Sequence, residues 1–333
     1  MRTKAFSQGL LVFGLLAAGL LMWAPPAAAA DEIVFPRGFD GLIDRMYHDA
    51  KAAELQEGLA AGGGTAFSRF SVRLYGGYNH ILAGDINEGS DGYFEYLEIY
   101  EALGIGTMTG AYKPLHGGLS FGGDVIYQIT PNIGVGLGVG YLRNTKTSSA
   151  TLADETGEIT VAATPTVSAM PVKLGAFFTV PVAGKINLTA DLGAALYTGL
   201  KLDALQRAEF DDESWQEMSF SGSRSSDIGF QGGLGFEYMF TPKMGFFVEA
   251  VGRYAKFKTF ETVATLYENS DGYTETGEGH LYLETYQGLE EWAHYTMFYI
   301  SEVEPVDDEY YTYTEPKIDL SGFSLQAGFR IRF

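Results

Sequence analysis

Five histidines are the first candidates for chemistry in a chain without cysteine: His48, His80, His116, His280 and His294. His80 and His116 come close in sequence to Asp85 and Ser120, and a Ser, His and acid arrangement would activate the serine hydroxyl as a nucleophile. The competing interpretation is that both histidines lie at strand ends and only face water. The absence of cysteine excludes thiolate catalysis and cysteine-ligated zinc. We expect no enzyme activity and assign no catalytic residue.

An acidic stretch, "GDINEGSDG", offers oxygen ligands at Asp85, Glu88 and Asp91. Carboxylates separated by glycine suit Ca²⁺ or Mg²⁺ in general terms. The stretch is not an EF-hand calcium loop, because the position that requires Glu is occupied by Tyr96. The alternative is a solvated acidic surface without a ligand. No cofactor is therefore expected beyond a loop-bound Ca²⁺ or Mg²⁺.

Charged residues recur on the polar side of alternating stretches. Four are acids and four are bases: Asp124, Asp191, Glu237, Glu249, Arg73, Lys173, Arg253 and Arg330. Equal numbers of opposite charges predict internal ion pairs, and Lys173 and Asp191 are placed to pair diagonally across a hairpin. Breaking a buried pair by removing one partner costs about 3–5 kcal/mol. The set predicts a closed polar network if the fold encloses this face.

Eight alternating stretches carry these residues and predict an all-β fold: 67–81, 116–129, 133–148, 163–180, 185–201, 223–240, 244–261 and 317–333. The connections between them alternate between short ones with Pro or Gly and long ones that are polar and acidic. This order predicts an antiparallel up-and-down meander with all its long loops at one end. Because the number of strands is even, both ends of the sheet lie on the short-turn side.

The polar face distinguishes a soluble β-sandwich from a membrane barrel. In a sandwich the polar face meets water, whereas in a membrane barrel the apolar face meets lipid and the polar face is enclosed. The third stretch carries four glycines on this face: Gly134, Gly136, Gly138 and Gly140. Glycine suits a strand that another group approaches closely, or a sheet that curves. Both explanations favour an eight-stranded transmembrane β-barrel, whose interior is narrow enough for side chains to fill.

One connection, 263–316, carries 13 Asp or Glu and no Lys or Arg, in a chain with a net charge of −20. Such a field repels nucleic acid and excludes a nucleic-acid-binding function. Within this connection, "GHLYLETYQGLEEWAHYTMFYISEVE" alternates and is rich in Tyr. It predicts a hairpin standing beyond the barrel. The alternative is that the hairpin adds two strands to the barrel, which would then have ten.

The N-terminal residues 1–30 predict a secretory signal peptide, with Arg2 and Lys4, then an apolar stretch, then three alanines. No second apolar run is long enough for a transmembrane helix, which excludes helical membrane proteins. Residues 31–66 combine the pattern of a short amphipathic helix with a run of three glycines. We expect a loosely held periplasmic segment before the barrel. The alternative is a helix that fills the barrel or binds a partner.

The chain ends in "FSLQAGFRIRF", in which Gln326, Gly328, Ile331 and Phe333 keep a characteristic spacing. With the signal peptide and the meander, this ending resembles the small eight-stranded outer-membrane β-barrels of Gram-negative bacteria, of the OmpA, OmpX and OmpW type. The resemblance covers 67–333 and implies that the last strand carries the signal read by the barrel assembly machinery. It also implies an integral outer-membrane location, periplasmic N- and C-termini, and contact with membrane lipid and lipopolysaccharide.

The expected function is a structural or surface-interaction role through acidic, Tyr-rich extracellular loops, with an unknown extracellular ligand. A narrow channel for small or hydrophobic solutes, which the resemblance to OmpW implies, is the first alternative. An outer-membrane lipid hydrolase is the second. Phospholipase barrels carry a histidine followed two residues later by serine, and here Ile81 and Leu82 follow His80 instead.

Overall fold

The computed structural model describes residues 68–333, except 156, 258–259, 261 and 289–292. The predicted signal peptide, 1–30, and the segment 31–66 lie outside the described residues. The helices and strands considered below all belong to the unit Arg69–Phe333.

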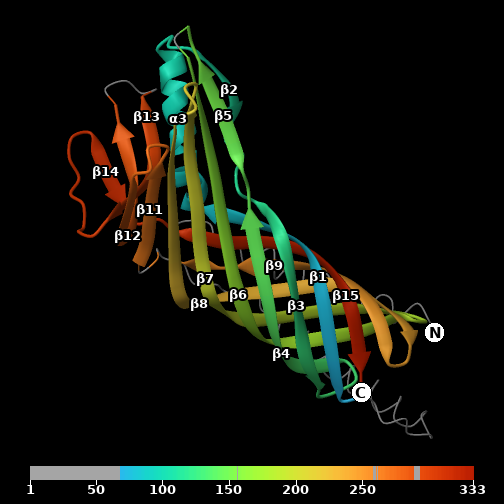
Figure 1. Cartoon of the computed structure of the whole chain (residues 1–333). Coiled ribbons are helices and arrows are strands. Elements are labelled where there is room, and N and C mark those ends of the chain that lie inside the picture. Colours follow the sequence, from blue (N-terminus) through green and yellow to red (C-terminus); the bar gives the residue numbers. More distant parts are fainter. Residues whose placement is uncertain (1–67, 156, 258–259, 261, 289–292) are drawn as a thin grey trace, which may run out of the picture. The chain divides into compact units, whose positions relative to one another are not determined.

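Eight antiparallel strands close into a ring in which each strand pairs with two neighbours. In ring order they are β1 (Phe70–Gly84), β3 (Gly117–Gln128), β4 (Ile133–Thr145), β6 (Glu158–Ala183), β7 (Ile186–Phe210), β8 (Trp215–Thr241), β9 (Met244–Tyr254) and β15 (Ile318–Arg332). The pairing of β1 with β15 closes the ring (Figure 1). The predicted eight-stranded meander is confirmed, and the alternative of ten barrel strands is wrong.

Tight turns join β3 to β4, β6 to β7 and β8 to β9 at one end of the ring, where β1 begins and β15 ends. Thr130 Oγ1 accepts hydrogen bonds from the N–H groups of Asn132 and Ile133, and Thr241 repeats this pattern in its own turn. The turn between β6 and β7 contains Gly184 with φ +52°, a conformation that glycine adopts without steric cost.

The outer surface of the ring is apolar. Large side chains from all eight strands are exposed on it, among them Leu74, Leu119, Leu137, Leu174, Leu192, Ile228, Val248 and Leu325. Exposed aromatic residues occur toward both ends of these strands, with Tyr127 and Tyr238 near the short turns and Tyr78 and Tyr254 at the opposite end. An apolar band flanked by aromatic residues is the lipid-facing surface of a transmembrane barrel.

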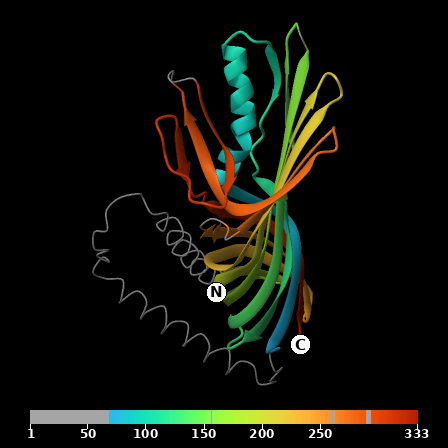
Figure 2. The same cartoon turned by 60° about the vertical axis from the view of Figure 1, so that its left-hand side comes forward.

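At the end opposite the short turns, β6, β7 and β8 continue beyond the ring into what we call the distal region (85–115, 148–168, 200–224 and 256–317). Its other elements are α3 (Asp85–Ala102), β2 (Thr107–Ala111), β5 (Ser148–Ala153), β10 (Lys256–Phe257), β11 (Thr262–Asn269), β12 (Thr274–Gln287), β13 (His294–Ser301) and β14 (Tyr311–Thr314). The strands β11, β12 and β13 extend the sheet from β8, and β14 pairs with β12. Figure 2 shows α3 standing between β12–β14 and the arm that carries β5.

A bulge in β7 exchanges the inner and outer faces where the ring meets the distal region. Gly199 has φ +56°, and two residues of β7 are opposite Ala169 alone on β6. On the barrel side of this bulge Leu196 is 42% exposed, while on the distal side Leu200 and Leu202 are each 1% exposed. A one-residue shift turns every side chain of a strand to the other face. The even-numbered leucines Leu192 and Leu196 of β7 therefore face lipid in the barrel, whereas Leu200 and Leu202 face the apolar core of the distal region.

Residues 85–102 form the helix α3, so the prediction of an acidic loop at this position is wrong. Ile86, Phe94 and Leu97 recur at helical spacing and are buried against the sheets. Within the described part of the chain, no helix combines the length and the apolar character needed to cross a membrane.

The helix α3 covers the free edge of β13. Glu95 Oε2 accepts a hydrogen bond from the N–H of Thr296 at 2.8 Å, and a Cβ added to Gly92 would overlap the carbonyl oxygen of the same residue. A Cβ added to Gly89 would lie 2.6 Å from the ring of Phe298. The glycines therefore allow the helix to approach closely, and the helix protects an edge that would otherwise offer unpaired backbone groups.

Candidate functional site

Ion pairs from five strands fill the middle of the ring. Arg73 on β1 donates to Glu249 on β9 at 2.6 Å and lies 3.8 Å from Asp124 on β3. Lys173 on β6 pairs with Asp191 on β7, diagonally across their hairpin. None of these five residues is more than 6% exposed. Removing any one of them would leave a charged partner buried without compensation.

A second group of charges lies nearer the short turns. Glu237 on β8 accepts a hydrogen bond from Arg332 at 2.5 Å and lies 3.8 Å from Arg330. Asn187 Nδ2 donates to the same carboxylate at 2.9 Å, and Arg330 Nε donates to Ser71 Oγ at 3.1 Å. The predicted set did not include Arg332, whose partly exposed side chain reaches Glu237 from the short-turn end of β15.

Arg253 differs from the prediction, because it forms no ion pair with a carboxylate among the described residues. Its guanidinium donates to Leu320 O at 2.8 Å and to Asn79 Oδ1 at 2.5 Å. Asn79 Nδ2 in turn donates to Asn144 Oδ1 at 2.6 Å. Neutral oxygens thus solvate this cation. Asn79 and Asn144 were not predicted, because neutral amides do not stand out in the charge pattern of the sequence.

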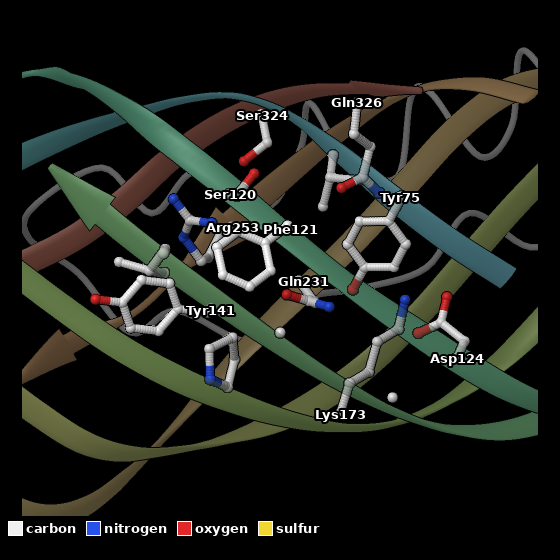
Figure 3. Close-up of a pocket in the computed structure, with 15 residues that line it drawn as sticks. Tyr75, Ser120, Phe121, Asp124, Tyr141, Lys173, Gln231, Arg253, Ser324 and Gln326 are labelled. Carbon is white, nitrogen blue, oxygen red and sulfur yellow. The ribbon is translucent and has the colours of Figure 1, made fainter. Parts of the chain in front are cut away.

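Between the ion pairs and this amide layer lies a small cavity with about 40 Å³ of free volume. Tyr75, Asp124, Lys173 and Gln231 line it from four strands (Figure 3). One water molecule needs roughly 10–15 Å³ of such space, so the cavity holds about three waters. A diffusing solute would have to displace the surrounding side chains.

The distal mouth of the ring is closed by an apolar cluster that we call the plug. Its members are at most 2% exposed: Ile81, Leu142, Tyr197, Leu200, Ala255, Phe257 and Leu320. The rings of Tyr197 and Phe257 have centroids 5.2 Å apart. The same cluster continues into the distal region through Phe220 and Phe298. Exposing each large side chain of the plug to water would cost about 1.5–3 kcal/mol.

Besides Tyr75, the rings of Phe247 and Phe177 lie inside the barrel, where the sequence indicated only polar and small residues. The guanidinium carbon of Arg73 lies 4.0 Å from the ring centroid of Phe247, and Lys173 Nζ lies 4.7 Å from that of Phe177. These rings stabilise the cations through their π faces. Phe247 has the same strand parity as Glu249, but the lipid-facing Phe246 beside it hides the alternation in the sequence.

The groups of the Ser, His and acid set do not converge. Ser120 lines the cavity inside the ring, whereas His80 lies on the outer face, stacked on Phe323 with centroids 5.0 Å apart. Asp85 Oδ2 accepts a hydrogen bond from the backbone N–H of Lys317 at 2.7 Å. This geometry does not support activation of the serine.

The candidate cation ligands Asp85, Glu88 and Asp91 lie on a helix and not in the predicted loop, and cation binding by them stays a prediction. The three residues lie three positions apart on α3, and no cluster of three potential metal ligands occurs in the part of the chain that the structure describes. Asp91 is instead half-buried. Its burial, followed by the charges of Glu95 and Glu98, raises the pKa of Asp91 to about 6.

The residues of the C-terminal motif have distinct places in the barrel. Gln326 Nε2 donates to Glu249 Oε2 at 2.8 Å inside the ring. A Cβ added to Gly328 would lie 2.9 Å from the ring of Phe247, so glycine makes room there. Ile331 pairs in register with strands on both of its sides. The role of the motif in assembly stays a prediction.

Residues 46–278, more than half of the chain, match the family described as outer membrane protein beta-barrel domain. No curated protein sequence matches the chain.

Solved structures show only distant similarity. The outer membrane protein OprG from Pseudomonas aeruginosa is 10% identical with a TM-score of 0.29, over 80% of this chain and 97% of that one. A major outer membrane protein from Thermus thermophilus is 13% identical with a TM-score of 0.30, over 79% and 99%. The outer membrane protease OmpT from Escherichia coli is 8% identical with a TM-score of 0.24, over 81% and 99%. These similarities are too low to carry an argument about function.

Proposed function

Since the chain belongs to the outer membrane protein beta-barrel domain family, it is an integral outer-membrane β-barrel protein, and we propose that its barrel is a closed anchor for a surface-binding distal region. The distal region presents acidic, Tyr-rich surfaces to a ligand outside the cell. The short turns and both termini of the chain face the periplasm. The observation that carries this proposal is the plug at the distal mouth of the ring.

The plug supports a closed barrel because it belongs to the folded core of the distal region. Phe257 in the mouth and Phe298 in β13 are members of one buried cluster. A channel that opened at this mouth would have to separate side chains that are fully buried together, at about 1.5–3 kcal/mol for each large one. A surface-binding protein needs this packing intact.

The interior of the ring supports the same function. Two groups of ion pairs and one amide layer cross it, and the cavity between them holds about three water molecules. An eight-stranded barrel leaves an interior that side chains can fill. A continuous path for solutes would require several of these buried polar contacts to break at once.

The proposal assigns contacts but no catalytic step. Membrane lipid covers the apolar band, lipopolysaccharide surrounds the base of the distal region, and the barrel assembly machinery reads the last strand. The separation of Ser120 from His80 across the barrel wall supports the absence of hydrolysis. Incubation of the folded protein with phospholipid and lipid A in detergent is expected to leave both lipids intact, and their cleavage would contradict the proposal.

Electrical recording tests the closed barrel. The refolded protein, inserted into a planar bilayer, is expected to give no steady conductance. A variant with Lys173→Ala and Asp191→Ala serves as the matched comparison, because it removes an ion pair from the lumen while the net charge stays unchanged. Steady single-channel currents through the unmodified protein would overturn the closed barrel and favour the narrow channel.

An array of defined peptides and oligosaccharides tests the proposed binding of a ligand by the distal region. The protein in lipid nanodiscs is expected to be retained by at least one class of compound among defined peptides and oligosaccharides. Empty nanodiscs of the same lipid composition are the control. If no class retains the protein, the proposed surface function fails, whatever the conductance result.

A further inference from the structure

The sheet of β12, β13 and β14 has two unlike faces. One face carries Leu281, Leu283 and Phe298, which are buried in the apolar cluster that includes the plug. The other face carries six tyrosines, which we call the tyrosine face: Tyr282, Tyr286, Tyr295, Tyr299, Tyr311 and Tyr313. Because successive residues of a strand point to opposite faces, the even spacing within each strand, four in β12 and β13 and two in β14, together with the register between the strands, places all six on one side.

The rings of the tyrosine face form contacts across all three strands. The ring centroid of Tyr286 lies 5.2 Å from that of Tyr295 and 5.3 Å from that of Tyr311. Tyr299 and Tyr313 lie 5.2 Å apart, and Tyr299 is 37% exposed. None of these six rings belongs to the apolar cluster on the opposite face of the sheet. Tyr282 is buried at 9% exposure, and the other four rings are partly exposed. A contiguous, partly exposed aromatic surface of this kind marks an interaction site.

Negative charge accompanies the rings. Glu284 lies on the tyrosine face, opposite Tyr313 in register. Burial, then the hydrogen bond with Glu284, raises the pKa of Tyr313 to about 12, and Asp308 adds to this effect. The phenol therefore stays neutral at physiological pH. The connection 263–316, which contains all three strands of the face, has 13 Asp or Glu and no Lys or Arg.

Aromatic faces and carboxylates together favour a cationic ligand. A Lys ammonium or an Arg guanidinium gains from the π face of a tyrosine, and a neighbouring carboxylate adds a charge-assisted hydrogen bond. An anionic ligand would be repelled by the same surface. A row of rings across three strands offers repeated positions of this kind.

We propose that the tyrosine face binds a basic segment, rich in Lys or Arg, of a partner polypeptide. This inference rests on the proposed surface-binding function and names the chemistry of its partner. The basic side chains lie over the rings, and Glu284 pairs with one of them.

Binding of a fluorescent decalysine peptide to the full-length protein in nanodiscs tests the inference. Decaglutamate and uncharged dextran are the comparison probes. We expect decalysine to bind, with an affinity that falls at high salt, and we expect neither comparison probe to bind. Tyr286→Leu removes the central ring and is expected to weaken decalysine binding about tenfold, while Tyr286→Phe keeps the ring and stays within about twofold.

Charge variants separate a local site from the general negative field. Glu284→Gln is expected to weaken decalysine binding about fivefold. The matched control is Glu158→Gln, which removes the same charge from the exposed start of β6 in the distal region, away from the tyrosine face; it is expected to change binding less than twofold. Migration on unheated gels verifies that every variant is folded.

Each other result counts against the inference. If Tyr286→Leu binds decalysine like the unmodified protein, or if both charge variants weaken binding equally, the tyrosine face is not the site. If the array retains the protein only through neutral or acidic compounds, the surface function stands and the basic partner is wrong. If the array retains nothing, both proposals fail together.

Discussion

The barrel and the distal region share three strands, yet their interiors are opposite in character. Inside the barrel, Arg73, Glu249 and their neighbours form ion pairs, and the apolar side chains point outward. Inside the distal region, Leu283 and Phe298 form an apolar core, and the acidic residues point outward. The difference follows from the solvent that each part meets, which is lipid around the barrel and water around the distal region.

A one-residue bulge is enough to change the polar interior of the barrel into the apolar interior of the distal region. In β7 the leucines keep even numbers on both sides of Gly199, from Leu192 to Leu202. The bulge at Gly199 shifts the strand by one residue, so the side chains that point outward in the barrel are continued by side chains that point inward in the distal region. One alternating sequence thus serves both solvents. Substitutions that remove buried side chains from each region measure how much each interior contributes to the free energy of unfolding.

The largest effect is expected in the barrel, from Arg73→Ala. This change leaves Glu249 and Asp124 buried without their cation, and it should lower the free energy of unfolding by about 3–5 kcal/mol. Urea unfolding in lipid vesicles, followed by the gel shift of the folded barrel, measures it. The control Arg207→Ala removes a distal-region pair with Glu217 whose arginine is 36% exposed, and should cost at most about 1 kcal/mol. Equal losses for the two variants would contradict a buried network.

A large but local effect is expected in the distal region, from Phe298→Ala. The ring packs on Phe220 with centroids 5.0 Å apart and is buried, so its removal should destabilise this region by about 3 kcal/mol. Limited proteolysis should then cut the distal region faster, while the barrel keeps its gel shift. Unfolding of both regions at the same urea concentration would show that they form one cooperative unit.

The packing of α3 is tested by Gly92→Ala. In an isolated helix this change stabilises by roughly 1 kcal/mol, but here the new Cβ would overlap the backbone of Thr296. We expect the distal region to lose about 1–3 kcal/mol instead, measured by proteolysis in urea. Glu98→Ala, at an exposed position of the same helix, should change stability little. A gain in stability for Gly92→Ala would mean that the helix does not approach β13 this closely.

The barrel was predictable from the sequence because its two faces repeat over every strand. Lys173 and Asp191 lie on the polar side of a period of two, and they pair although Lys173 is opposite Ala195, four residues from Asp191 along β7. Arg253 and Phe247 were not predictable in the same way. Their partners are neutral amides or cations from other strands, which no local pattern marks.

The distal region was less predictable because its elements are short and irregularly connected. The glycines of "GDINEGSDG" favoured a loop, whereas Gly89 and Gly92 allow close packing of a helix. The recurrence of Ile86, Phe94 and Leu97 at helical spacing was the available signal. The tyrosine face was visible only as an alternation, since its three strands are joined in space by pairing that the sequence does not show.

The smallest expected effect concerns Asp91, a half-buried carboxylate of the distal region, in contrast to the buried carboxylates of the barrel. Burial first, then Glu95 and Glu98, raise the pKa of Asp91 to about 6 in the folded protein, against about 3.9 in an unfolded chain. Between these pH values the folded protein binds more protons than the unfolded chain, so stability falls as pH rises through this window. Asp91→Asn should therefore stabilise the distal region by about 1 kcal/mol or less at pH above 6, allowing for solvent screening of a half-exposed group. Below about pH 4 the carboxyl is protonated in both states, and the benefit should vanish. Proteolysis in urea at both pH values measures the difference, with Glu158→Gln as the control, and an equal effect at both would show that charge on Asp91 is not the cause.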